Sequence, residues 1–230
     1  EEVDGQTHYP QDTSRQLELT YGVLGQVLTA AGSGPEDVVK CLDYISPQCL
    51  LQYPNTDDVR RGLFGNHFPA TTSIPVNRLL RPEGHVETEM VAVMGGTREE
   101  IRVPEWEPTQ GGLTRSAGVK KGNMLHISGQ AAVDNVTGNT VGGFDIVAQC
   151  EQAYSNIARI MEEGGYSMDD IVNTIEWVSP NGLMDYRKAG EVRRKYFGDR
   201  FPSATGVAMH KIMGRPEPVS YTHSTLPPIS

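Results

Sequence analysis

Hydrophobic residues recur at every third or fourth position in two long segments, residues 16–32 and 150–165, and each segment ends in glycine. This spacing predicts an amphipathic helix, and the glycine marks its C-terminal end. Two shorter segments, residues 37–45 and 170–178, are rich in β-branched residues and alternate in polarity, which predicts strands. Each half of the chain is therefore expected to begin with a helix followed by a strand.

The same order continues further along each half. Residues 57–68 and 184–198 show a shorter helical pattern, and strands are expected at 71–80, 85–93 and 204–212. The second half has an additional hairpin upstream, "NMLHISGQAAV" followed by "DNVTGNTV". Helices and strands in this order predict an α+β fold, in which two helices cover a mixed sheet.

The two halves are related by an internal repeat. When the chain is shifted on itself by 133 positions, many identical residues coincide, beginning with Tyr21 and Tyr154. The segment "FGNHFPATTSIPV" then coincides with "FGDRFPSATGVAM". A period of this length is the size of a small domain, so the chain is expected to be a tandem of two units rather than a solenoid.

Three segments of the second half carry a family resemblance: "KGNMLHISGQAAVDNVTGNTVGG", "QCEQAYSNIARIMEEGGYSMDDIVNTIEWV" and "YFGDRFPSATGVAM". They occur in the order and spacing of the Rid/YjgF family, the reactive-intermediate imine deaminases and their relatives. The resemblance implies a chorismate-mutase-like unit, in which two helices back a six-stranded sheet. It also implies a barrel-like homotrimer with small-molecule pockets at the clefts between subunits.

The resemblance divides the chain into unit one at 1–96, a linker at 97–111 and unit two at 112–230. Unit one lacks the family's first hairpin, which leaves a sheet edge to be covered in an oligomer. Unit two ends in an atypical last strand that places Tyr221 and His223 at alternating positions. The Pro-Pro pair after it would end the strand, and residues beyond about Leu226 are expected to be poorly ordered.

Family deaminases hold the substrate carboxylate with an arginine in a P-A-R-T motif. Unit one has Thr71 at that position and unit two has Ala204, followed by Thr72 and Thr205. Neither unit can form the bidentate contact that a guanidinium makes with a carboxylate. The resemblance therefore implies a pocket wall at these four residues, with an altered specificity.

Other positions of the family pocket are partly retained. Gly129 in "SGQ" matches a glycine whose backbone lies beside the ligand, and Glu87 in "HVETEMV" matches the acidic residue that holds the attacking water. Unit two has Tyr221 in place of this acid, which implies one competent type of cleft per chain. Arg115 occupies the position of a family aromatic residue, where it could supply an anion contact or lie solvated at an edge.

Metal and cofactor sites are not expected. His85, Glu87 and Glu89 alternate and would share one face of a strand, where a metal is the less favoured interpretation and a partly solvated sheet face the favoured one. The sequence contains no nucleotide-binding glycine loop and no nucleophile elbow. We therefore expect neither a metal nor a cofactor.

Composition narrows the partners. The formal net charge of -9 over 230 residues argues against a nucleic-acid partner, and the short apolar runs argue against a membrane span. The acidic, polar N-terminus does not resemble a signal peptide. Three cysteines without C-x-x-C spacing suggest reduced thiols in a cytoplasmic protein.

The expected function is a hydrolytic deaminase-like reaction on a small imine, enamine or related molecule at a cleft between units, with Glu87 as the catalytic acid/base. Hydrolysis of C=N needs a positioned water and a carboxylate that can accept its proton. A protein that binds a small molecule without catalysis is the alternative, because the arginine is missing. An endoribonuclease, as described for some family members, is a weaker alternative given the negative charge.

Overall fold

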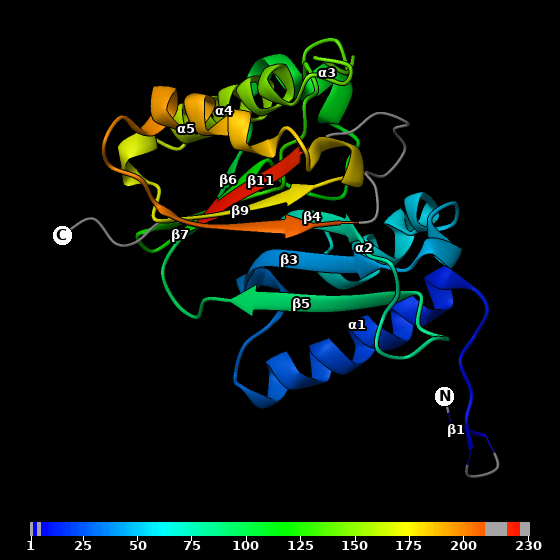
Figure 1. Cartoon of the computed structure of the whole chain (residues 1–230). Coiled ribbons are helices and arrows are strands. Elements are labelled where there is room, and N and C mark those ends of the chain that lie inside the picture. The colour runs from blue at the N-terminus through cyan, green and yellow to red at the C-terminus, as the bar shows by residue number, and fades with distance from the viewer. Residues whose placement is uncertain (1, 4–5, 210–219, 226–230) are drawn as a thin grey trace.

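The computed structural model describes residues 2–3, 6–209 and 220–225, and shows two sheets that pack together between outer helices (Figure 1). The first unit forms a three-stranded sheet of order β4-β3-β5, in which β3 and β4 are parallel and β5 is antiparallel. Its elements are α1 (Thr13–Ala30), β3 (Val38–Ile45), α2 (Asp57–Phe64), β4 (Ala70–Pro75) and β5 (Val86–Ala92). A short hairpin, β1 (Glu2–Val3) and β2 (Gln6–Thr7), precedes them.

The second unit forms a six-stranded sheet of order β10-β9-β11-β8-β7-β6. It contains β7 (Gly118–Lys121), β8 (Met124–Ile127), α4 (Ile146–Glu163), β9 (Asn173–Val178), α5 (Ala189–Phe197), β10 (Ser203–Ala208) and β11 (Ser220–Thr225). The first residues of helices α1 and α4 are 133 positions apart, as are those of strands β4 and β10, which is the period of the sequence repeat. The expected α+β fold of two repeated units is confirmed.

Strand β6 (Arg98–Ile101) lies in the segment expected to be a linker. It pairs with β7 and forms one edge of the second unit's sheet, and α3 (Glu107–Gln110) follows it. Residues 97–111 therefore do more than connect the units, because they extend the second sheet by one strand.

The tail strand β11 takes the place in its unit that β5 takes in the first. Glu87 of β5 is opposite Tyr44 on β3, and Tyr221 of β11 is opposite Trp177, which lies 133 positions after Tyr44. The last strand expected for unit two is therefore present, and it pairs with β9 through Thr225. The side chains of 220–225 and the predicted order of residues beyond 226 lie outside the described residues.

Local sequence explains where the helices begin and end. The side chain of Asp12 accepts a hydrogen bond from the backbone of Arg15 at the start of α1, and Asp145 caps α4 in the same way. The repeated Phe-Gly pair ends α2 and α5, since Gly65 and Gly198 adopt φ values of 58° and 56°. This left-handed conformation suits glycine and explains why the repeat retains it.

Each helix pair covers the outer face of its own sheet, and the inner faces of the sheets pack against each other (Figure 1). Leu42 and Ile74 of the first unit contact Trp177 and Met209 of the second in one buried cluster. Lys121 and Asp37 form an ion pair across the same boundary. The two units therefore share a core, which fixes their relative position.

Two further observations concern membrane-spanning helices and disulfides. Within the described residues, no helix has the length and apolar character needed to cross a membrane. Cys41, Cys49 and Cys150 are buried, and none of the three forms a disulfide.

A buried histidine between the sheets predicts a pH dependence of stability. His126 on β8 is only 5% exposed, and neither ring nitrogen has a hydrogen-bond partner in the described part of the chain. Burial, with a smaller contribution from Lys40, lowers its pKa to about 4 from the usual 6.5. As the pH falls, the unfolded chain therefore takes up this proton first. The stability contributed by the neutral imidazole is present above pH 6.5 and is lost as the pH falls towards 4.

We expect His126→Phe to flatten the dependence of the unfolding free energy on pH in this interval. One proton changes the unfolding free energy by about 1.4 kcal/mol per pH unit, and the total change over this interval is on the order of 3 kcal/mol. Urea unfolding from pH 7 to pH 4 measures it. Parallel curves for the two proteins would show that His126 takes no part in the acid sensitivity.

An exposed edge strand predicts self-association. All six residues of β10 are exposed at the edge of the second sheet, whereas the equivalent β4 is mostly buried against the second unit. Because an unpaired edge can pair with another chain, we expect a homo-oligomer, for which the family resemblance implies a trimer. Val207→Lys should shift the protein to smaller species in light scattering at micromolar concentration. A wild-type monomer under these conditions would contradict the prediction.

Candidate functional site

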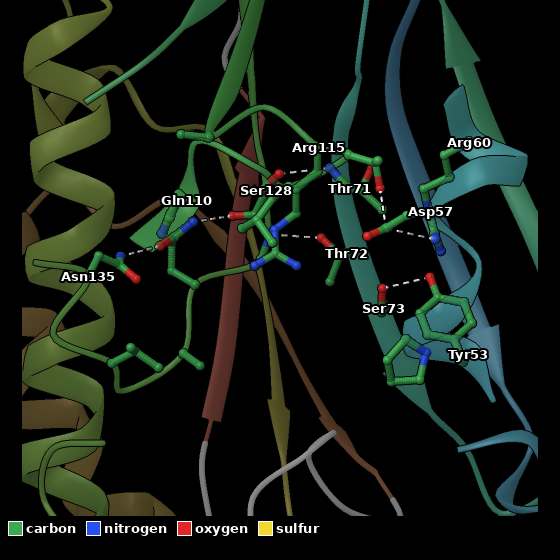
Figure 2. Close-up of a pocket in the computed structure, with 18 residues that line it drawn as sticks. Tyr53, Asp57, Arg60, Thr71, Thr72, Ser73, Gln110, Arg115, Ser128 and Asn135 are labelled. Carbon is green, nitrogen blue, oxygen red and sulfur yellow. Dashed lines mark hydrogen bonds and ion pairs between the residues drawn. The ribbon is translucent and has the colours of Figure 1, made fainter. Parts of the chain in front are cut away.

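A cavity of about 320 Å³ lies where β4 of the first unit meets the loops before β7 and after β8 of the second. Figure 2 shows Thr71, Thr72 and Ser73 along one strand, with Gln110, Ser128 and Asn135 across from them. Both units contribute to its wall, so the cavity exists only because the two repeats pack in this arrangement. The expected inter-unit cleft is therefore found within one chain.

Hydrogen bonds join the units at the floor of the cavity. The Thr71 amide donates to Ser128 Oγ at 2.7 Å, and the Gly129 amide donates to Thr72 Oγ1 at 2.9 Å. Ser128 Oγ in turn donates to the Ser116 carbonyl at 2.6 Å. The P-A-T-T motif of the first unit is thus tied to the S-G-Q motif of the second.

Close approach explains the glycine of S-G-Q. A Cβ atom at position 129 would lie 2.6 Å from Thr72 Cγ2 and 3.1 Å from Thr72 Oγ1. Thr72 is almost fully buried, so it cannot move aside easily. Only glycine allows the backbone at position 129 to approach the Thr72 side chain this closely.

A buried polar network forms the wall on the side of the first unit. Arg60 Nη2 lies 3.1 Å from Asp43 Oδ2, and the same carboxylate accepts hydrogen bonds from Tyr53 and Thr88. Burial, followed by the nearby Asp43 charge, raises the pKa of Tyr53 well above its usual value, which keeps the phenol protonated. Tyr53 Oη also lies 2.8 Å from Ser73 Oγ.

Asp57 is the one carboxylate that lines this cavity in the described part of the chain. Its Oδ1 accepts a hydrogen bond from Thr114 Oγ1 at 2.6 Å and lies 3.8 Å from Arg60 Nη1. The half-exposed side chain stands at the N-terminal turn of α2, held between the two units. It combines a fixed position with access to the cavity.

Of the residues predicted from sequence, Thr71, Thr72, Arg115 and Gly129 line this one cavity. Tyr53, Asp57, Arg60 and Ser73 are among the lining residues that were not expected from the sequence. The repeat contained a signal for two of them, because Tyr53 coincides with Tyr186, and Arg60 with Arg193.

Glu87 does not line this cavity. It is exposed on β5, the edge strand of the first sheet, and borders a separate depression of about 250 Å³ together with Tyr9 and Arg81. Within the chain, the structure therefore separates the predicted acid from Gly129 and Thr71. Its catalytic role stays a prediction, and it would require a different cleft from the one between the units.

Ala204 and Thr205 also lie outside the cavity. Both are exposed on β10, opposite Thr174 and Ile175 of β9. The second unit thus presents its copy of the motif on an open edge.

His85 has a structural contact. Its Nδ1 lies 2.8 Å from Thr13 Oγ1 at the start of α1, and the residue is buried while Glu87 and Glu89 are exposed. No group of three or more potential metal ligands occurs among the described residues.

The close contact of Gly129 predicts a specific steric effect. Gly129→Ala should push Thr72 and the S-G-Q segment apart and lower stability by about 1–3 kcal/mol, the usual cost of overpacking. Gly112→Ala is the matched control, since a Cβ there would meet nothing within 4 Å. Thermal unfolding measures both. Equal melting temperatures for the two variants would mean that the junction adapts without strain.

Comparisons with known proteins bear on this geometry. The family model described as Endoribonuclease L-PSP matches residues 1–94 and 113–215. A RutC family protein of Pyrococcus horikoshii is 35% identical over 97 residues, which is 42% of this chain and 75% of the relative. A 2-iminobutanoate/2-iminopropanoate deaminase of Escherichia coli K12 is 31% identical over 98 residues, which is 41% of this chain and 73% of that protein.

A solved structure extends the likeness to both units together. The crystal structure of a chorismatase covers 94% of this chain and 70% of its own, with a TM-score of 0.66 and 19% sequence identity. At this identity the match shows a shared fold alone. Two matches of one family model, together with the repeated elements, show that the chain belongs to the Endoribonuclease L-PSP (Rid/YjgF) family and carries two of its units in tandem.

Proposed function

We propose that the chain hydrolyses the C=N bond of a small imine that carries an anionic group, in the cavity between its two units. The observation that carries this proposal is that Asp57, Arg115 and Gly129 line one cavity. A volume of about 320 Å³ suits a small molecule. The name of the E. coli relative, an imine deaminase, supports the reaction class.

The chemistry needs one group that can exchange protons. Water attacks the imine carbon, Asp57 accepts a proton from that water, and the electron pair of the C=N bond moves to nitrogen. Asp57 then returns the proton to nitrogen, which gives a carbinolamine. Asp57 next takes the proton of the carbinolamine hydroxyl and passes it to nitrogen, so that the C–N bond breaks as the C=O bond forms and ammonia leaves a carbonyl product. The Thr114 hydroxyl holds Asp57 in place by donating to Oδ1.

The missing family arginine changes how an anion would be held. Thr71 cannot supply charge, but Arg115 lines the same cavity from the second unit. We assign the anion contact to Arg115, with a different approach from that of an arginine on β4.

A binding protein without catalysis is the second candidate. The absence of arginine at positions 71 and 204 favours it, as does the distance in the fold between Glu87 and this cavity. An endoribonuclease is weaker, because a net charge of -9 opposes a polyanionic substrate.

The proposal predicts that Asp57→Asn lowers hydrolysis by at least roughly 100-fold, the lower range for loss of a general acid/base. The substrates are imines produced in situ from amino acids by an amino acid oxidase, and released ammonia is followed with time. Asp58→Asn is the matched control, because Asp58 is the exposed neighbour on α2 and does not line the cavity.

Glu87→Gln is measured in the same assay. If Glu87→Gln loses ammonia release while Asp57→Asn keeps it, Glu87 is the general base and the reaction takes place outside this cavity. If the wild type accelerates ammonia release from none of the imines but binds the corresponding 2-oxo acids, the protein is a binder and the hydrolase proposal fails.

A further inference from the structure

Each unit buries one carboxylate between a tyrosine and an arginine. In unit one Asp43 accepts from Tyr53 and pairs with Arg60. In unit two Glu176 accepts from Tyr186, and Arg193 Nε lies 3.5 Å from its Oε1. These residues coincide under the 133-residue shift, so the two units hold equivalent copies of one network.

The two networks differ at the position that faces the tyrosine hydroxyl. In unit one Ser73 Oγ lies 2.8 Å from Tyr53 Oη and lines the cavity. In unit two the corresponding residue is Gly206, where a Cβ would lie 2.9 Å from Tyr186 Oη. A serine side chain therefore does not fit the second network as it stands, and only the first network extends to a hydroxyl.

The network fixes the direction of the hydrogen bonds. The Asp43 carboxylate, paired with Arg60, can only accept, so the Tyr53 proton points to Asp43. Tyr53 Oη can then only accept from Ser73, whose proton is taken up in that contact. The remaining lone pairs of Ser73 Oγ are left for the cavity, so Ser73 acts there as an acceptor.

We propose that Ser73 is a specificity-determining residue that accepts a hydrogen bond from an N–H group of the ligand. The cavity would thus take a small anion with a nitrogen donor next to its acidic group, the anion facing Arg115. This inference rests on the proposed cleft site and adds the requirement for a donor. It also means that the ligand is selected by the strand of unit one that carries the P-A-T-T motif, and not by the corresponding strand of unit two.

Oxamate and pyruvate are suitable probes, because both are small monoanions of similar shape and differ in an NH2 against a CH3 group. An acceptor at Ser73 should make oxamate bind about fivefold to tenfold more tightly than pyruvate, the range expected for one net hydrogen bond. Isothermal titration calorimetry, or NMR titration if binding is weak, gives the two dissociation constants.

Variants separate this role from a purely structural one. Ser73→Ala should abolish the preference for oxamate and leave pyruvate binding unchanged. Tyr53→Phe should reduce the preference below about twofold, since the Ser73 proton becomes free to turn towards the cavity. Tyr186→Phe removes the equivalent bond in unit two, so it controls for lost stability and should keep the preference.

Each outcome decides the proposal. Equal affinities of the wild type for the two anions, an unchanged preference in Ser73→Ala, or no binding of either anion would overturn it. The ammonia assay is independent of this test. Retained oxamate preference without hydrolysis would leave the role of Ser73 standing and reject the hydrolase.

Discussion

Two hydrogen bonds between the units determine where the cavity lies. The amides of Thr71 and Gly129 donate to the hydroxyls of Ser128 and Thr72, so each unit supplies a donor and an acceptor to the other. These groups are buried or nearly so, and separating the units would leave them without partners, which is costly in an apolar setting. Shape adds to this constraint, because the contact requires a residue without a Cβ at position 129.

The two buried networks differ in how many of their polar groups have hydrogen-bond partners. In unit two Tyr154 donates to Glu176, whereas the hydroxyl of the equivalent Tyr21 has no hydrogen-bond partner among the described residues. Asp43 is one methylene shorter than Glu176, and its carboxylate contacts Tyr53 and Arg60 but accepts no hydrogen bond from Tyr21. Unit one thus leaves one buried hydroxyl unsatisfied while its carboxylate organises the wall of the cavity.

The units also differ in what surrounds them. Strand β4 is covered by the second unit and becomes a wall of the cavity, while the equivalent β10 is open along its whole length. The same motif therefore lies in two environments, and sequence similarity between the copies does not imply equal function. The burial that excludes water and strengthens electrostatic interactions is present at one copy and absent at the other.

The sequence by itself determined the elements, their order and the duplication, because helix and strand periodicities and terminal glycines are local properties. The family resemblance also implied pocket positions at Thr71, Thr72 and Gly129, and these three residues line one cavity. Only the tertiary structure decided that residues 98–101 join the second sheet and that Glu87 lies away from this pocket. Such facts depend on which strand edges and faces meet, and these contacts between distant segments leave no periodic pattern in the chain.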